Sequence, residues 1–183
     1  NHGTISPTAS AISGTTNGIN ISNFGTMTNG GTAFPVISLG APVSQAINAT
    51  IFNSGTIRGV GTGADGILLQ TGSCDITNTG IISGDQDDAI EINASVNPGL
   101  LSNRITNSGT IIGGANFAIN LDADMDTVIN TGLLLGNVEL GGGVDFYDGR
   151  LGRIQGVLTA GAGNDTILGG AGDEAFFGDG DND

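Results

Sequence analysis

Residues 105–113 read Ile-Thr-Asn-Ser-Gly-Thr-Ile-Ile-Gly, and the segment Asn107-Ser108-Gly109-Thr110-Ile111 within them decides the fold. Its pattern, Asn-x-Gly-x-apolar, occurs five more times, at residues 1–5, 23–27, 53–57, 78–82 and 130–134. Successive copies start 22, 30, 25, 29 and 23 residues apart. A pattern that returns at this interval is typical of a solenoid, in which each repeat is one unit of the stack.

Each copy also predicts strands. Two positions before the Asn stands an apolar residue, so that apolar and polar side chains alternate as in a half-buried strand. These apolar residues are Ile21, Ile51, Ile76, Ile105 and Val128. A second short strand is expected after most copies, at residues 37–39, 67–69, 90–92, 119–121 and 138–140. Each repeat therefore predicts at least two strands with Gly and Asn at the corners.

This arrangement favours an all-β fold, a single-stranded right-handed parallel β-helix. One coil cannot bury its own apolar face, but coils stacked about 4.8 Å apart build a continuous core. Asn tolerates left-handed backbone conformations, and stacked Asn amides can bond to their equivalents above and below, so we expect the Asn column to be structural. The longest gaps leave loops at 31–45 and 94–104, where a solenoid usually carries recognition.

Composition narrows the choice of function. The chain has 183 residues with 34 Gly, 18 Asp plus Glu, four Arg, no Lys and a formal net charge of −14. So much Gly argues against a helical protein, and the absence of a strict Gly-x-y period excludes collagen. No apolar run approaches the roughly 18 residues of a membrane span. The charge argues against nucleic acid and anionic membranes and makes cations the expected partners.

The single Cys74 permits no internal disulfide and no thiolate zinc site, and we expect it to be a small buried residue. The chain starts at Asn1 without Met and stops within a repeat, so we expect it to be a segment of a longer protein.

Acidic residues concentrate in one part of the chain. Residues 122–183 hold 12 of the 18 acids, so we divide the solenoid into β-helix coils at 1–121 and an acidic region at 122–183. Within it, Asp126, Asp145, Asp165 and Asp183 lie 19, 20 and 18 residues apart. This spacing predicts a column of carboxylates, which repel one another unless a cation lies between them. The alternative is a solvated acidic face.

Three consecutive nonapeptide frames, at 160–168, 169–177 and 178–183, resemble the calcium-binding RTX repeat, Gly-Gly-x-Gly-x-Asp-x-apolar-x. A looser copy covers residues 140–148. The resemblance implies a β-roll in which glycine carbonyls and Asp carboxylates of adjacent turns bind Ca²⁺. The expected metal-binding residues are Asp126, Asp145, Gly161, Gly163, Asp165, Gly170, Gly172, Glu174, Asp181 and Asp183. Glu174 stands where the repeat has Asp, and Ala160 where it has Gly. The apolar positions predict Tyr147, Phe176 and Phe177 in the core.

Residues 105–113, 126–132 and 136–141 also resemble the repetitive passengers of large bacterial adhesins and autotransporter-like proteins. The two resemblances imply export from a Gram-negative bacterium to the medium or the cell surface. We therefore expect a structural and adhesive module stabilised by Ca²⁺, with the loops at 31–45 and 94–104 facing host or self glycans or proteins. The alternative is the non-catalytic region of a larger secreted enzyme, such as a polysaccharide lyase or protease.

A catalytic site within this segment is not expected. A polysaccharide lyase needs a basic residue, and the chain offers only Arg58, Arg104, Arg150 and Arg153, of which only the last two are close in sequence. We expect Arg150 and Arg153 to pair with Asp148 and its neighbours. A Ser-His-Asp hydrolase would have to use His2 at the terminus.

Overall fold

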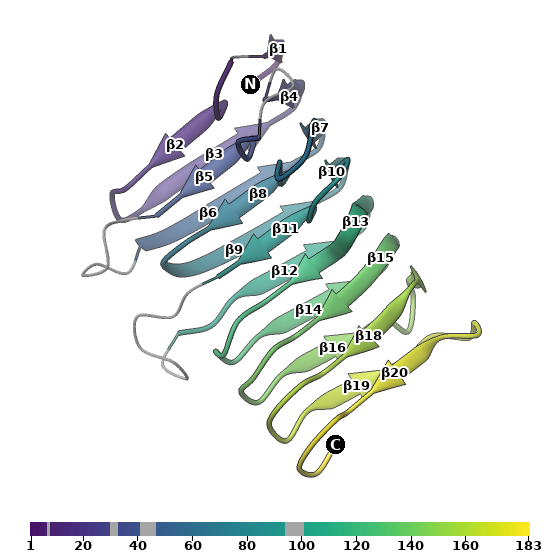
Figure 1. The fold of residues 1–183 in the computed structure, drawn as a ribbon. Helices are drawn as coiled ribbons and strands as arrows, with labels where there is room; N and C mark the ends of the chain where they lie inside the picture. Colours follow the sequence, from purple (N-terminus) through teal and green to yellow (C-terminus); the bar gives the residue numbers. More distant parts are fainter. Residues whose placement is uncertain (7, 30–32, 41–46, 94–100) are drawn as a thin grey trace.

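The chain forms a stack of coils built from parallel β-strands. A computed structural model describes residues 1–6, 8–29, 33–40, 47–93 and 101–183, and these contain strands and turns but no helix (Figure 1). Every strand pair among them is parallel. The expected all-β solenoid is therefore confirmed at the level of class and strand direction.

The strands form two sheets. One has seven strands: β3 (Ile19–Asn23), β6 (Ile47–Asn53), β9 (Gly72–Asn78), β12 (Arg104–Asn107), β14 (Thr127–Asn130), β16 (Phe146–Asp148) and β19 (Thr166–Leu168). The other has thirteen: β1 (Thr4–Ile5), β2 (Ile12–Gly14), β4 (Thr26–Thr28), β5 (Ile37–Leu39), β7 (Thr56–Gly59), β8 (Ile67–Leu69), β10 (Ile81–Gly84), β11 (Ile90–Ile92), β13 (Thr110–Asn120), β15 (Leu133–Glu139), β17 (Arg153–Gln155), β18 (Val157–Thr159) and β20 (Ala175–Phe177).

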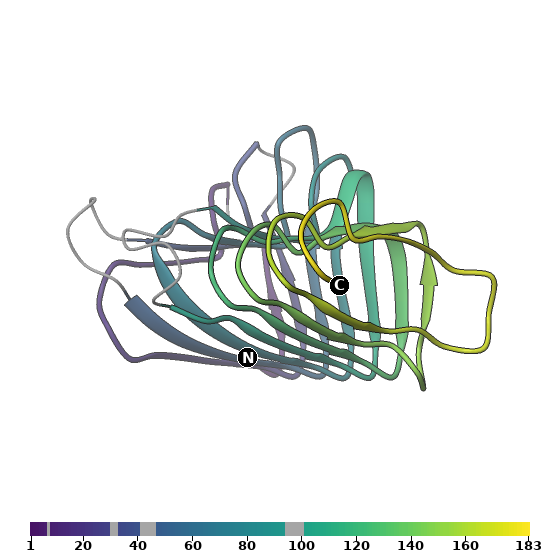
Figure 2. The same ribbon diagram turned by 90° about the horizontal axis from the view of Figure 1, so that it is seen from below.

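The thirteen-stranded sheet is curled, and the seven-stranded sheet closes the coil. A typical coil runs through β6, β7 and β8 before the chain returns to β9, which pairs with β6. In β13 and β15 two such strands fuse into one, with register shifts between Ile112 and Ile119 where the strand bends. Figure 2 shows the successive coils behind one another, from the N-terminal to the C-terminal end.

Columns of equivalent residues fill the core. Strand register stacks Ile51, Ile76, Ile105, Val128 and Tyr147 on consecutive coils, and all five are fully buried. Burial of each such side chain stabilises the fold by about 1.5 to 3 kcal/mol relative to exposure. The second strands expected at 37–39, 67–69 and 90–92 are β5, β8 and β11. Those expected at 119–121 and 138–140 overlap the ends of β13 and β15, which stop one residue earlier, at Asn120 and Glu139.

The Asn-x-Gly turn explains why Gly recurs beside Asn. At Gly55, Gly80, Gly109 and Gly132, an added Cβ would lie 2.0 to 2.1 Å from the carbonyl oxygen of the equivalent Gly in the preceding coil. No side chain fits in that space. Contrary to our expectation, the Asn residues do not adopt a left-handed backbone, because each from the second copy onward is the last residue of a strand, namely Asn23, Asn53, Asn78, Asn107 and Asn130. Among described residues other than Gly, only Asp179 and Asp181 have positive φ.

Two further expectations need correction. The loop at 31–45 is interrupted, because residues 37–39 belong to β5, and the loop at 94–104 ends before Arg104, the first residue of β12. Of the other residues in these two loops, 33–36, 40 and 101–103 are described, whereas 31–32, 41–45 and 94–100 lie outside the described part of the chain. Phe177 is 55% exposed rather than buried, because it pairs with the outward-facing Thr159 while its neighbour Phe176 packs against the core.

None of the described residues belongs to a helix with the length and apolarity needed to cross a membrane.

Candidate metal-binding site

Asp126, Asp145, Asp165 and Asp183, here called the aspartate ladder, lie on four consecutive coils. The Oδ1 atom of each accepts a hydrogen bond from the backbone N–H of the equivalent residue one coil earlier. The donors are Asn103 at 2.9 Å, Asp126 at 2.7 Å, Asp145 at 2.8 Å and Asp165 at 3.0 Å. The four carboxylates therefore stack along the axis of the solenoid.

In earlier coils, the positions equivalent to the aspartate ladder carry other types of residue. Asn103 precedes β12 as Asp126 precedes β14, and its Oδ1 accepts a hydrogen bond of 3.0 Å from the backbone of Cys74. Cys74 pairs in turn with Ala49. The column thus changes from apolar residues through an amide to carboxylates. Sequence reasoning missed Asn103 because only acidic residues were compared, although its place before a strand was visible.

Three of the four ladder carboxylates are buried, and Asp183 in the last coil is exposed. Asp126, Asp145 and Asp165 are at most 4% exposed, and the Oδ2 atom of each is buried without a hydrogen-bond partner. Burial, with a smaller contribution from the charges of neighbouring Asp residues, raises the pKa of Asp126 to about 7 and that of Asp145 to about 8. Removing a carboxylate from water in this way is costly unless it is protonated or paired with a cation.

No arginine supplies that cation. In the described part of the chain, ion pairs join Arg58 to Asp85 and Arg150 to Asp148, and neither involves the ladder. A bound cation would relieve the repulsion between the stacked carboxylates and give the Oδ2 atoms a partner.

Glycines bring backbone carbonyls to the turns that carry the aspartate ladder. Gly161 and Gly163 have φ values of 97° and 140°, which side-chain-bearing residues rarely adopt. A Cβ at Gly161 would lie 1.7 Å from the carbonyl oxygen of Gly141, so adjacent turns approach closely there. Asp181 adopts a similar left-handed conformation, with φ of 71°, two residues before Asp183. Gly161, Gly163 and Asp181 therefore lie on the turns that carry the ladder.

The structure places the other expected ligands elsewhere. Gly170, Gly172 and Glu174 lie between β19 and β20, at the other end of β19 from the ladder. Glu174 Oε2 accepts a hydrogen bond of 2.6 Å from the backbone of Gly170. Gly172 and Glu174 line a surface hollow of about 260 Å³ together with Arg153. The ten expected ligands thus form two separate groups.

A preformed site with several acidic side chains is not present in either group. In the part of the chain that the structure describes, no three carboxylate, imidazole or thiolate groups converge closely enough to hold one metal ion. Backbone carbonyls would have to supply part of the coordination, which suits Ca²⁺ because it takes six to eight oxygen ligands in flexible geometry.

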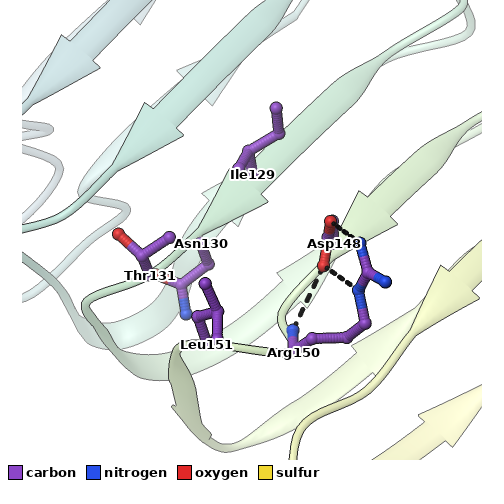
Figure 3. A pocket seen from close by; sticks show the side chains of 6 residues that line it. All are labelled: Ile129, Asn130, Thr131, Asp148, Arg150 and Leu151. Atoms are coloured by element: carbon purple, nitrogen blue, oxygen red, sulfur yellow. Dashed lines mark hydrogen bonds and ion pairs between the residues drawn. The ribbon is translucent and has the colours of Figure 1, made fainter.

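A larger surface hollow of about 410 Å³ lies beside Asn130, the last residue of the Asn column, and does not include the ladder (Figure 3). Arg150 lines it and donates two hydrogen bonds to Asp148, of 3.0 Å from Nε and 2.8 Å from Nη2. The expected pairing of Arg150 with Asp148 is confirmed, and this guanidinium is already neutralised.

No protein-family model matches the chain. No curated protein and no solved structure matches it either. The geometry of the chain itself therefore carries the functional argument.

Proposed function

We propose that this chain is a structural and adhesive segment of an exported surface protein of a Gram-negative bacterium. In this proposal the coils form a right-handed parallel β-helix, and its C-terminal part is an RTX-like β-roll stabilised by Ca²⁺. The observation that carries the proposal is the aspartate ladder, in which three buried carboxylates each keep one oxygen without a hydrogen-bond partner.

The chemistry of the edge supports calcium over other ligands. It offers only hard oxygen donors, carboxylates and backbone carbonyls, and no imidazole or thiolate lies on it. A net charge of −14 also attracts cations from solution. Binding of Ca²⁺ to the folded state alone would stabilise the coils that carry the ladder, and calcium at millimolar concentration outside the cell would favour folding after export.

An adhesive role rests on different features. The solenoid presents long strand faces, and the residues of segments 31–45 and 94–104 that lie outside β5 and β12 are the proposed places of contact with surface glycans or proteins. Catalysis is not proposed, because two of the four arginines, Arg58 and Arg150, are engaged in ion pairs with Asp85 and Asp148.

The test is thermal unfolding in EDTA and in 5 to 10 mM CaCl₂, combined with hydrogen exchange to locate the effect. We expect Ca²⁺ to raise the melting temperature and to slow exchange mainly from residue 122 onward. The double variant Asp145→Asn/Asp165→Asn should lose most of this response, while Asp75→Asn, an exposed acid on β9, should keep it. A melting curve that is the same in EDTA and in calcium would rule out the proposal.

A further inference from the structure

We propose that Asp122 completes the first cation site of the aspartate ladder together with Asp126 and Asp145. Asp122 itself lies outside the glycine-rich repeats. This inference rests on the proposed function, because it assigns one site within the calcium-binding edge. It concerns a residue that neither the nonapeptide pattern nor the 18 to 20 residue spacing of the ladder includes.

Stacking of the coils places Asp122 on the first turn of the proposed calcium-binding edge. Its carbonyl oxygen accepts a hydrogen bond of 2.8 Å from the backbone of Gly142, and a Cβ at Gly141 would lie 1.8 Å from the same oxygen. Asp122 therefore lies directly before Gly141 in the stack, and Gly161 follows in the next coil. Of these three equivalent positions, only the first carries a side chain.

The Asp122 side chain is held at the turn. Its Oδ1 accepts a hydrogen bond of 3.3 Å from the backbone N–H of Asp124, while its Oδ2 is buried without a hydrogen-bond partner. The Oδ2 atoms of Asp126 and Asp145 are likewise buried and without a partner, and these two residues are 2% and 1% exposed. Three carboxyl groups on two adjacent coils thus each keep one oxygen available.

The three groups also act on one another. The turn that carries Asp122 and Asp126 stacks on the turn that carries Gly141 and Asp145, so the three carboxylates lie on neighbouring turns and repel one another. A divalent cation among three carboxylates converts this repulsion into attraction. The three do not meet at one point in this structure, so binding draws at least one of them inward, and backbone carbonyls complete the coordination.

Fewer carboxylates lie between the stacked turns of the next two coils. Between the turns at 141–145 and 161–165 only Asp145 and Asp165 contribute carboxylates, because glycines occupy the positions equivalent to Asp122. Ligand charge is a main determinant of Ca²⁺ affinity in proteins. We therefore expect the gap that includes Asp122 to bind Ca²⁺ more tightly than the gap that follows it.

The experiment compares the whole chain with Asp122→Asn and with the control Asp75→Asn by calorimetric titration with CaCl₂ and by Tb³⁺ luminescence. Asp122→Asn should lower the stoichiometry by one ion or weaken the tightest class of sites at least tenfold. Asp75→Asn removes the same charge from an exposed position and should bind as the unmodified chain does.

The possible outcomes separate the inference from the proposed function. If the unmodified chain binds Ca²⁺ and Asp122→Asn binds it equally well, the assignment of Asp122 is wrong and the proposed function stands. If the unmodified chain binds no Ca²⁺ at millimolar concentration, both fail, and the buried carboxyl groups are protonated acids. If Asp122→Asn does not fold, Asp122→Gly, which copies the residue of the next two coils, makes the same test.

Discussion

The side-chain amide of Asn78 donates a hydrogen bond of 2.8 Å to the side-chain oxygen of Asn107, 29 residues further along the chain. The same bond joins Asn53 to Asn78 and Asn107 to Asn130, so the amides form a continuous buried chain through the coils. Each amide also bonds to the backbone of its own turn, as Asn78 does with Gly80. The Asn column therefore ties the corners of successive coils together.

Replacing Asn78 with Ala should destabilise the protein by about 3 kcal/mol, because the substitution leaves buried donors and acceptors of two neighbouring coils without partners. Urea unfolding followed by circular dichroism measures the change. The control is Asn20→Ala on the exposed face of β3, which should change the free energy of unfolding by less than about 0.5 kcal/mol. Equal effects of the two variants would contradict the structural role of the column.

A methyl group should be far more costly at Gly109 than at Gly3, although both occupy the same position of the Asn-x-Gly pattern. The Cβ at Gly109 would lie 2.1 Å from the carbonyl oxygen of Gly80, whereas at Gly3 the nearest atom is 4.0 Å away. Gly109→Ala should therefore lose at least about 3 kcal/mol or fail to fold, and Gly3→Ala should behave as the unmodified chain. Soluble yield and urea midpoints of both variants provide the measurement.

The protein should become less stable in chelator as the pH rises from about 4 to about 8. Asp65 is 3% exposed and keeps its Oδ1 without a hydrogen-bond partner. Burial, followed by the charges of Glu91, Asp87 and Asp88, raises its pKa from 3.8 to about 8. Because the folded state holds this proton more tightly, its stabilisation is complete below pH 4 and is lost through this window, by up to about 1.4 kcal/mol per pH unit for this group.

Asp65→Asn should remove that part of the pH dependence. We expect the variant to match the unmodified chain near pH 4 and to melt at a higher temperature at pH 8, as measured by calorimetry in EDTA. Other buried acids keep their own contributions, so only the difference between the two slopes is diagnostic. Parallel slopes for the two proteins would show that Asp65 ionises normally.

The thiol of Cys74 should not react with a thiol reagent such as DTNB while the protein is folded. Cys74 is buried, and burial raises the pKa of its thiol to about 12, so very little thiolate is present at neutral pH. Its coil precedes the aspartate ladder, so EDTA should leave the labelling rate unchanged, whereas urea should increase it. Rapid labelling in native buffer would contradict this burial.

Sequence alone predicted the coils well because the physics that builds them is periodic. Asn and Gly return at each corner, and apolar residues alternate before them, so the positions of β5, β8 and β11 followed directly from the pattern. The handedness of the coil does not follow from these patterns, since it depends on how the chain crosses from one sheet to the other.

The nonapeptide frame explains why the predicted ligands lie in two separate groups. Nine residues make half a coil here, since Asp165 and Asp183 stack 18 residues apart. Glu174 lies nine residues after Asp165 and therefore falls half a turn away, at the other end of β19. A repeat unit found in sequence thus need not be the unit that stacks, and only residues separated by whole coils can share a site.

Acids outside the repeats were the hardest to foresee. Asp65 and Asp122 belong to no periodic motif, and only strand register brings Asp65 near Glu91 or Asp122 near Asp145. Such contacts join residues 20 or more positions apart, so composition and spacing give no signal for them.

The shortening of the coils has a consequence for the dimensions of the molecule. Hydrogen bonds between coils fix the axial rise at about 4.8 Å, however many residues a coil contains. The coil from Asn23 to Asn53 takes 30 residues and that from Asp165 to Asp183 takes 18. Each residue therefore adds about 0.16 Å of axial extent in the first and about 0.27 Å in the second. For a protein that has to span a distance, the glycine-rich coils are the part of the chain that gives the greatest reach per amino acid synthesised.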